Sequence, residues 1–242
     1  MSNSHFKIPI LMYHCIESAP KSTVMRSLYV PPHRFKFQMW LLKVMGYKGL
    51  SIKDLRPYLE GEKKGKVVGI TFDDGYKNNL IYAAPILTKF NFTATCYLVS
   101  DRVGDFNLWD LNKNITQKPL MTQHEVFKWI NLGMDIGAHG KNHLDLTSIS
   151  EKAAYEEMCE SKIHLENLYN IDINDFCYPY GRFNDKVYNF AKEIGYLSSV
   201  TMLRGKASFK SDKYKLPRIP VNYRTMPYLF LAKILTKYEE RK

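Results

Sequence analysis

Strand-like and helix-like segments alternate along the whole of this chain. Such alternation favours parallel strands with helices packed outside them. Six to eight such units either close into a barrel or form an open doubly wound sheet, and in both cases the functional site lies at the carboxyl ends of the strands. The expected strands are 8–16, 67–73, 93–99, 135–139, 176–178, 197–202 and 216–221. The expected helices are 31–45, 51–59, 79–90, 122–132, 150–169, 184–195 and 227–238.

The length and composition fit one large domain. The 242 residues are 45% hydrophobic, which suffices for a well-buried α/β core. No Pro/Gly/Ser-rich linker, internal repeat or low-complexity segment interrupts the sequence. We therefore expect a single domain over residues 1–242, with a C-terminal amphipathic helix at about 225–240.

Targeting signals are not evident in the sequence. The apolar run 8–16 is short for a signal peptide and contains His14, and no stretch approaches transmembrane length. The four cysteines form no Cys-x-x-Cys pair, and most lie in apolar patterns, which favours free buried thiols in a reducing compartment. We expect a cytoplasmic protein, with peripheral attachment to the inner membrane as the alternative.

Basic residues outnumber acidic ones. The 35 Lys and Arg against 24 Asp and Glu give a formal net charge of +11, and such a field attracts anions. The segment 224–242 mixes apolar residues with cations, as a helix on an anionic membrane does, although such helices more often pack on their own domain. No aromatic-interleaved basic motif supports a nucleic-acid partner. The sequence predicts no particular oligomeric state.

Two adjacent carboxylates, Asp73 and Asp74, end the apolar run that begins at Val67. Neighbouring strand residues point to opposite faces, so the two acids share one environment only if the backbone turns, and Gly75 permits that turn. Two like charges this close resist ionising together unless a positive group lies between them. We therefore expect the chain to supply further metal ligands, or hydrogen bonds that separate the roles of the two acids.

Two histidines, His139 and His143, follow another short strand, four positions apart. Imidazoles at this spacing can converge on one metal. Two histidines and one carboxylate with open positions suit a divalent metal that activates water. The imidazoles favour zinc, and manganese, cobalt or nickel are alternatives.

A third motif, Phe176-Cys177-Tyr178-Pro179-Tyr180-Gly181-Arg182, places a rigid proline turn after a strand. Such a turn can aim a backbone N–H at a reacting oxygen, although an ordinary β-turn has the same composition.

Together the three motifs resemble those of the polysaccharide deacetylases, the NodB-homology family or carbohydrate esterase family 4. Thr71–Gly75 matches the first motif in full, His139–His143 matches the second in both histidines, and Cys177–Gly181 aligns with the third. The resemblance extends over about residues 8–221 and is nearest to the poly-N-acetylglucosamine deacetylases.

The resemblance implies a distorted (β/α)7-type barrel and metal-dependent hydrolysis of the N-acetyl group of an aminosugar or a cell-envelope glycan, a C–N bond other than a peptide bond. It implies Asp73 as the general base, and Asp74, His139 and His143 as metal ligands. The backbone N–H of Tyr180 would donate to the oxyanion. If the two acids lie in different environments, one can act as the base while the other binds the metal.

The sequence departs from the family pattern at two places. Cys177 replaces the arginine that orients the base, and Arg218 is the candidate to provide that contact from elsewhere. The C-terminal histidine that serves as general acid is missing, because after the second motif only His164 follows, and we expect it to face solvent. His14 is a candidate acid, and Asp73 could also return the proton itself.

Aromatic side chains near the motifs are candidates for stacking on sugar rings, namely Tyr76, Trp109, Tyr178 and Tyr180. Trp109 lies in the polar stretch 105–117 and is the strongest of them. Two other functions stay open: a deacetylase or deformylase of a lipid-linked or nucleotide-linked sugar, and a glycan-binding pseudoenzyme that has lost turnover.

Overall fold

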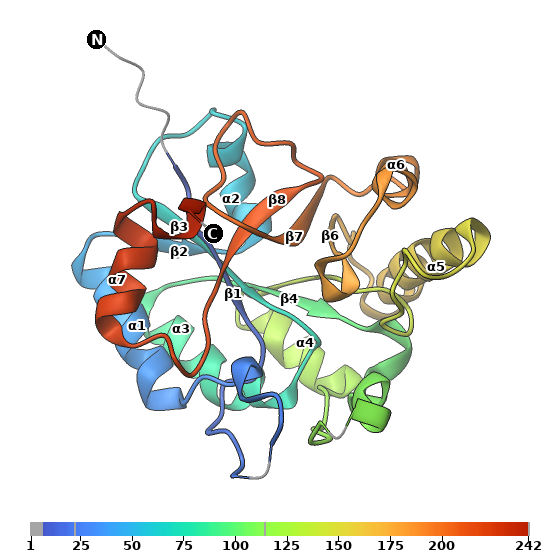
Figure 1. Cartoon of the computed structure of the whole chain (residues 1–242), viewed down its shortest axis with the longest axis horizontal. Coiled ribbons are helices and arrows are strands. Elements are labelled where there is room, and N and C mark those ends of the chain that lie inside the picture. The colour runs from blue at the N-terminus through green and yellow to red at the C-terminus, as the bar shows by residue number, and fades with distance from the viewer. Residues whose placement is uncertain (1–6, 22, 114, 242) are drawn as a thin grey trace.

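Seven parallel strands form a closed barrel (Figure 1). The computed structural model describes residues 7–21, 23–113 and 115–241. The first six residues, which belong to the N-terminal segment considered above for a targeting signal, lie outside the described residues. The ring runs β1-β8-β7-β6-β5-β4-β3 and closes where β3 pairs with β1. Its strands are β1 (Ile10–Tyr13), β3 (Val67–Phe72), β4 (Thr95–Leu98), β5 (Asp135–Ala138), β6 (Asp175–Cys177), β7 (Ser198–Arg204) and β8 (Leu216–Pro220). The predicted (β/α)7-type barrel is confirmed.

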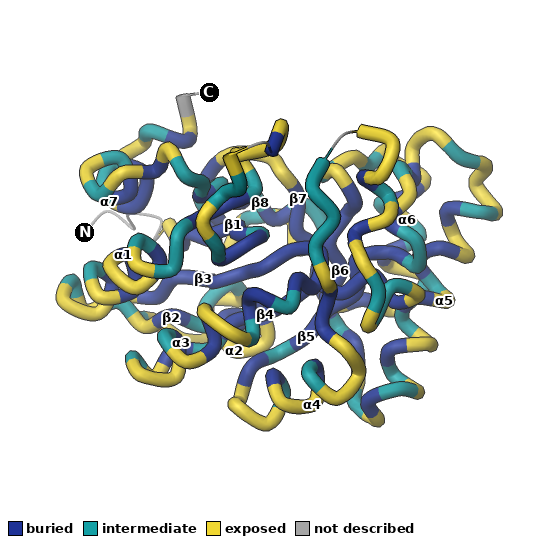
Figure 2. The backbone as a smooth tube through the Cα atoms, turned by 90° about the horizontal axis from the view of Figure 1, so that it is seen from below, coloured by how far each residue is buried: buried dark blue, intermediate teal, exposed yellow. Residues whose placement is uncertain are grey.

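Helices surround the ring, and their outward sides are exposed (Figure 2). Local capping explains where several begin: Ser51, Ser150 and Asn184 each accept a hydrogen bond from the first turn, and Thr122 forms the predicted capping box with Glu125. The α-helices are α1 (Pro32–Val44), α2 (Ile52–Leu59), α3 (Ala84–Phe90), α4 (Gln123–Asn131), α5 (Glu151–Tyr169), α6 (Asp185–Glu193) and α7 (Pro227–Leu235).

Three local features differ from the sequence expectation. A short strand, β2 (Lys48–Leu50), pairs with the first half of β3 and lies outside the ring. The helix expected over 79–90 begins with a π-helical turn, Asn79–Ala83, before α3. The helix expected to reach Tyr238 ends at Leu235, and a 3-10 turn follows at Tyr238–Arg241.

The C-terminal helix α7 is shorter than the amphipathic helix expected over 225–240, and it packs on its own domain, as such helices more often do. The cation inside it, Lys233, is buried and bonds to the Pro220 carbonyl and to Glu239. The positive charge of Lys233 therefore takes part in a buried contact between α7 and the rest of the domain. Among the described residues, no helix combines the length and apolarity needed to cross a bilayer.

An apolar layer fills the middle of the barrel interior. Its members include Ile10, Val67, Tyr97, Val200 and Leu216, together with side chains from α2. Helix α2 can approach because Gly69 has no side chain: a Cβ there would lie 2.9 Å from Leu55. The strand amino ends are therefore packed against α2, and the polar motifs lie at the carboxyl ends.

Candidate active site

Asp73 is held by Arg218 in a buried two-pronged ion pair. The Arg218 Nη1 and Nη2 atoms donate to the two Asp73 carboxylate oxygens at 2.6 and 2.7 Å. Both side chains are almost fully buried. Burial acts to raise the pKa of Asp73, but the charge and hydrogen bonds of Arg218 outweigh it and hold the pKa below its ordinary value. Asp73 is therefore ionised and fixed in orientation.

Arg218 is itself anchored on three sides. Its Nε donates to the Thr201 carbonyl at 2.9 Å, Nη1 donates to the Thr71 hydroxyl at 3.1 Å, and Nη2 contacts the Cys177 sulfur at 3.3 Å. The planar guanidinium uses its fixed fork of donors to meet all these groups at once. The structure thus places an arginine from β8 against Asp73, next to the cysteine that stands in the third motif.

Asp74 turns away from the strand that delivers Asp73. Its backbone φ of 75° and the φ of 78° at Gly75 lie in the left-handed region, which non-glycine residues enter rarely and at a cost. This turn brings Asp74 toward the second motif. The Asp74 Oδ1 atom lies 3.3 Å from His139 Nε2 and 3.4 Å from His143 Nε2.

The three side chains Asp74, His139 and His143 form a buried donor set whose ligand atoms all lie within 4.8 Å of one another. The His139 Nδ1 atom is 2.7 Å from the Cys177 carbonyl, a contact that assigns a proton to Nδ1 and leaves Nε2 as the ring nitrogen that faces Asp74. One carboxylate oxygen and two imidazole nitrogens fit a divalent metal of the zinc type.

The electrostatics of this donor set favour an ionised Asp74. Burial acts to raise the pKa of Asp74, but the hydrogen bonds from the two histidines outweigh it and hold the pKa well below its usual range. Burial lowers the pKa of His143, whereas the contacts of His139 with Cys177 and Asp74 outweigh burial and raise its pKa. A second cluster, Asp73 with His139 and Cys177, also has ligand-like spacing, but Arg218 already occupies both Asp73 oxygens.

Helix α5 holds the loop that carries the two histidines. The buried Glu157 carboxylate accepts from the backbone N–H groups of Lys141 and Asn142 at 3.0 and 2.8 Å. Ser161, one turn later, donates to the Gly140 carbonyl at 3.0 Å. The sequence analysis did not single out these two positions, although polar residues at i and i+4 on the inward face of a helix are the signal that could have found them.

His14 lies beside Asp73. Its Nε2 atom is 3.9 Å from Asp73 Oδ2, and its side chain is partly exposed. This placement agrees with a candidate proton donor. His164 is half exposed on α5 and contacts Asp101 at 3.0 Å, which agrees with the expectation that it faces solvent.

The proline turn of the third motif folds as a 3-10 turn, Pro179–Gly181, with a left-handed Tyr180 at φ 57°. Gly181 is required there, because a Cβ would lie 2.5 Å from Met202. The Tyr180 ring lies edge-on against His143, with ring centroids 4.6 Å apart. The turn thus brings the Tyr180 ring next to the donor set.

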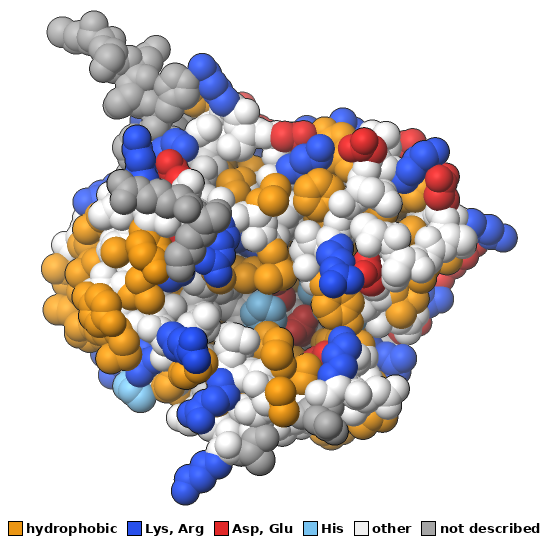
Figure 3. Space-filling view, viewed as in Figure 1, with side chains coloured by type: hydrophobic (Ala, Val, Ile, Leu, Met, Phe, Trp, Pro, Cys, Tyr) orange, Lys and Arg blue, Asp and Glu red, His pale blue; other side chains and the backbone are white. Residues whose placement is uncertain are grey.

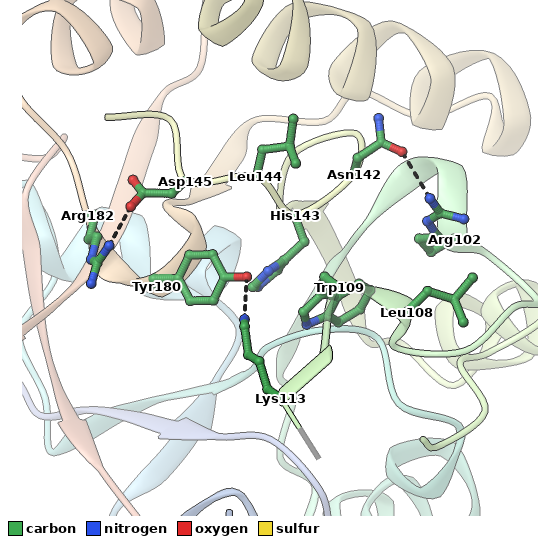
Figure 4. A pocket seen from close by; sticks show the side chains of 10 residues that line it. All are labelled: Arg102, Leu108, Trp109, Lys113, Asn142, His143, Leu144, Asp145, Tyr180 and Arg182. Atoms are coloured by element: carbon green, nitrogen blue, oxygen red, sulfur yellow. Dashed lines mark hydrogen bonds and ion pairs between the residues drawn. The ribbon is translucent and has the colours of Figure 1, made fainter. Parts of the chain in front are cut away.

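A cavity of about 710 Å³ opens beside His143 (Figure 4). Trp109 lines it and stacks on the His143 ring, with centroids 4.6 Å apart and planes 20° apart. Tyr180 lines the opposite side, and its hydroxyl accepts a hydrogen bond from Lys113 at 3.0 Å. The cavity volume is typical of ligand sites, and Trp109 forms part of its wall.

Two other aromatic residues expected to contact sugar are buried instead. Tyr178 is fully buried, stacks on Phe183 and donates to the Tyr214 carbonyl. Tyr76 is also buried, in a small cluster with Tyr29. Both therefore shape the core around the site, the Tyr178 ring in the main hydrophobic core and the Tyr76 ring in its own small cluster.

Comparisons with known proteins agree with this geometry. A model of the family described as polysaccharide deacetylase matches residues 60–198. The Bacillus subtilis protein YxkH is 33% identical over 218 residues, covering 89% of this chain and 72% of that protein. A poly-β-1,6-N-acetyl-D-glucosamine N-deacetylase of Staphylococcus epidermidis is 28% identical, covering 83% and 71%.

A solved structure extends the likeness to the whole fold. The Streptococcus pyogenes deacetylase PplD, solved in complex with acetate, superposes with a TM-score of 0.83 at 30% identity, covering 96% of this chain and 99% of that one. With the motifs in one buried site and the family matched over more than half of its length, this chain is an enzyme of the polysaccharide deacetylase family.

Proposed function

We propose that this enzyme hydrolyses the N-acetyl group of an N-acetylated aminosugar within a glycan. The observation that carries the proposal is the division of labour between the adjacent acids: Asp73 is ionised and oriented by Arg218, while Asp74 faces the two histidines. Two acids in unlike environments can act as base and as ligand in one reaction.

Asp74, His139 and His143 would hold a divalent metal, with zinc favoured by the imidazole ligands. When bound, such a metal polarises the acetyl carbonyl and lowers the pKa of water. The remaining work falls to groups of the chain. Asp73 takes the proton of the attacking water, and the Tyr180 backbone N–H donates to the oxyanion that forms.

Departure of the sugar amine requires a proton, and two groups can deliver it. His14 lies 3.9 Å from Asp73 Oδ2, close enough for both to reach one reacting centre. Asp73 can also hand on the proton that it has taken from water. The balanced reaction consumes one water and yields acetate and a free amine.

The substrate class follows from the relatives and the cavity. Named relatives act on poly-β-1,6-N-acetyl-D-glucosamine, and the cavity beside the donor set presents Trp109 and Tyr180 as surfaces for sugar rings. A β-linked N-acetylglucosamine polymer is therefore our first choice. A lipid-linked or nucleotide-linked sugar remains the second candidate, and product masses separate the two.

The direct test replaces Asp73 with Asn and measures acetate release from N-acetylglucosamine oligomers with zinc added. We expect a loss of about 10²–10⁴-fold, because no base remains to accept the water proton. The exposed Asp172→Asn variant is the matched control and should retain full turnover. Undiminished release by Asp73→Asn would contradict the assigned role.

Metal binding is measured separately by titration calorimetry. Asp73→Asn should still bind zinc, whereas His143→Ala should bind it at least tenfold more weakly. A protein that binds zinc tightly but releases no acetate from any oligomer or lipid-linked sugar would instead favour the glycan-binding alternative.

A further inference from the structure

One side of the molecule contains no acidic residue in its outward helices. Helix α1, helix α3 with its π-helical turn, and helix α7 contain no Asp or Glu, whereas α5 alone contains five Glu. Helices α1 and α3 pack against each other, and α7 lies beside α1 in Figures 1 and 2. Helices α1, α3 and α7 therefore carry no negative side chain, in contrast to α5.

Helix α1 is apolar on both of its faces. Phe35, Met39 and Leu42 are buried in the core, while Phe37 and Trp40 stay 40% and 45% exposed on the outside. The two exposed rings pack on each other with centroids 5.2 Å apart. Exposed aromatic rings that pack together on the outside of a helix form an apolar patch of the kind that often marks an interaction site.

Lysines flank these exposed rings. We call the set formed by Lys36, Phe37, Trp40, Lys43 and Lys89 the lysine–aromatic face. Most of it lines a shallow groove between α1 and α3, and Figure 3 shows hydrophobic side chains gathered on the α1 and α7 side of the molecule. None of the three lysines forms an ion pair with a described residue.

We propose that the lysine–aromatic face binds the surface of an anionic phospholipid bilayer. Aromatic side chains prefer the boundary between headgroups and acyl chains, and each lysine near the surface adds attraction to anionic lipid. Charge decides against a second copy of the chain as the occupant. A two-fold interface would bring the lysines of one face against the same lysines of its partner, with no acid to neutralise them.

The membrane contact would come from the flank of the barrel and not from the C-terminal helix alone. The exposed side chains Tyr228 and Leu235 of α7 extend the apolar surface beside α1, but the α7 lysine is directed inward. The catalytic donor set is built from the carboxyl ends of the strands, so the flank can rest on lipid while the cavity stays open.

The test is sedimentation with vesicles of phosphatidylcholine mixed with phosphatidylglycerol, against vesicles of pure phosphatidylcholine. We expect the wild-type protein to bind the mixed vesicles only. Replacing Lys36, Lys43 and Lys89 together by Gln should lower the partition coefficient about a hundredfold, at roughly fivefold per lysine. The Phe37→Gln, Trp40→Gln double variant should lower it about tenfold or more.

Matched controls come from the acidic side of the molecule. The triple change of Lys152, Lys186 and Lys192 to Gln alters the net charge equally and should leave binding within about threefold of wild type, since only the contacting charges count at short range. Trp40→Phe should keep the binding but lose the blue shift of tryptophan fluorescence on vesicles. Far-ultraviolet circular dichroism checks that each variant is folded.

Three results would overturn the proposal. The first is equal binding to neutral and anionic vesicles, and the second is wild-type binding by both face variants. The third is a dimer in light scattering that the Phe37, Trp40 double variant converts to a monomer, because the face would then be an interface between copies. The readouts need no turnover, so they are independent of the proposed deacetylation.

Discussion

Each end of the barrel interior carries two neighbouring aspartates, one of which pairs with an arginine, but the number of donors differs. At the carboxyl end, Arg218 donates from two nitrogens to the two oxygens of Asp73, and two histidines face Asp74. Burial acts against ionisation there, yet these partners outweigh it and hold both pKa values below their ordinary range. Negative charge is thus kept where it can act on water or a cation.

The amino end places its acids at the first residues of β5 and β6, and it stabilises their charge less well. A single Arg56 nitrogen is shared between the Asp175 oxygens at 3.0 and 3.1 Å, and Ser198 adds one hydrogen bond. Asp135 receives the Thr95 hydroxyl at 3.3 Å and a backbone hydrogen bond from Ile136. Burial raises the pKa of Asp135 to about 7 and raises that of Asp175 as well. Similar residues therefore give a reactive end and a structural end.

The largest difference between the ends should appear when each arginine is replaced by Met. Arg218→Met leaves a buried carboxylate without its partner and should lower the free energy of unfolding by about 3–5 kcal/mol. Arg56→Met should cost about 1–2 kcal/mol, because the Arg56 side chain is partly exposed and Asp175 can take up a proton. Urea denaturation measures both, and equal losses would contradict the comparison.

A smaller, pH-dependent effect should come from Asp135→Asn. The folded pKa of about 7 lies above the unfolded value. The contribution of Asp135 to stability is therefore complete below about pH 4 and is lost as the pH rises through about 7. Asn mimics the protonated acid, so the variant should unfold like wild type near pH 4 and be about 1–2 kcal/mol more stable near pH 8, after discounting for the partial exposure of this residue.

The carboxyl end should show the opposite sign. The Asp73 pKa is lowered in the folded state, so its contribution is present at neutral pH and is lost as the pH falls through the folded pKa. Asp73→Asn should therefore destabilise the protein near neutral pH and converge on wild type in acid. Thermal melts of both variants across pH measure this, and parallel pH profiles would show that the two ends do not differ.

The smallest effect should come from Tyr97, whose ring lies in the apolar layer between the two ends. Its buried hydroxyl has no hydrogen-bond partner among the described protein groups. Tyr97→Phe keeps the ring and removes an unpaired polar group, so stability should stay level or rise by up to about 1 kcal/mol. A loss of about 1 kcal/mol would instead show that this hydroxyl makes a stabilising hydrogen bond. Acetate release by the variant should not change.

Local patterns carried most of the fold prediction. Helix caps act within a few residues, so the sequence predicts where the helices that begin after Ser51, Thr122, Ser150 and Asn184 start. Strand β2 was not, because three residues, Lys48-Gly49-Leu50, contain no readable period. Its position is set by pairing with β3, a contact distant in sequence.

The residues of the site fall into the same two groups, those that local sequence patterns predict and those whose position depends on contacts distant in sequence. The three motifs located the acids, the histidines and the proline turn, because each is a short run of residues with fixed chemistry. The inward direction of Tyr178 depends on how the end of β6 packs, which no local spacing encodes. Glu157 and Ser161 have a local signal, their i and i+4 spacing on α5, but only the structure identifies the loop that they hold. Arg218 was a candidate only because the arginine of the third motif was missing, and its two-pronged contact needed the closed barrel to bring β8 to β3.

Left-handed backbone at non-glycine residues occurs at two kinds of place in the described chain. Asn91 and Asn170 end helices, where Asn is well tolerated. Asp74, His143 and Tyr180 adopt it at the site itself, at a cost of about 1–3 kcal/mol each. Laboratory selection of this enzyme for heat resistance alone would thus favour Gly or Asn at these three positions, and its most stable descendants would be among its poorest catalysts.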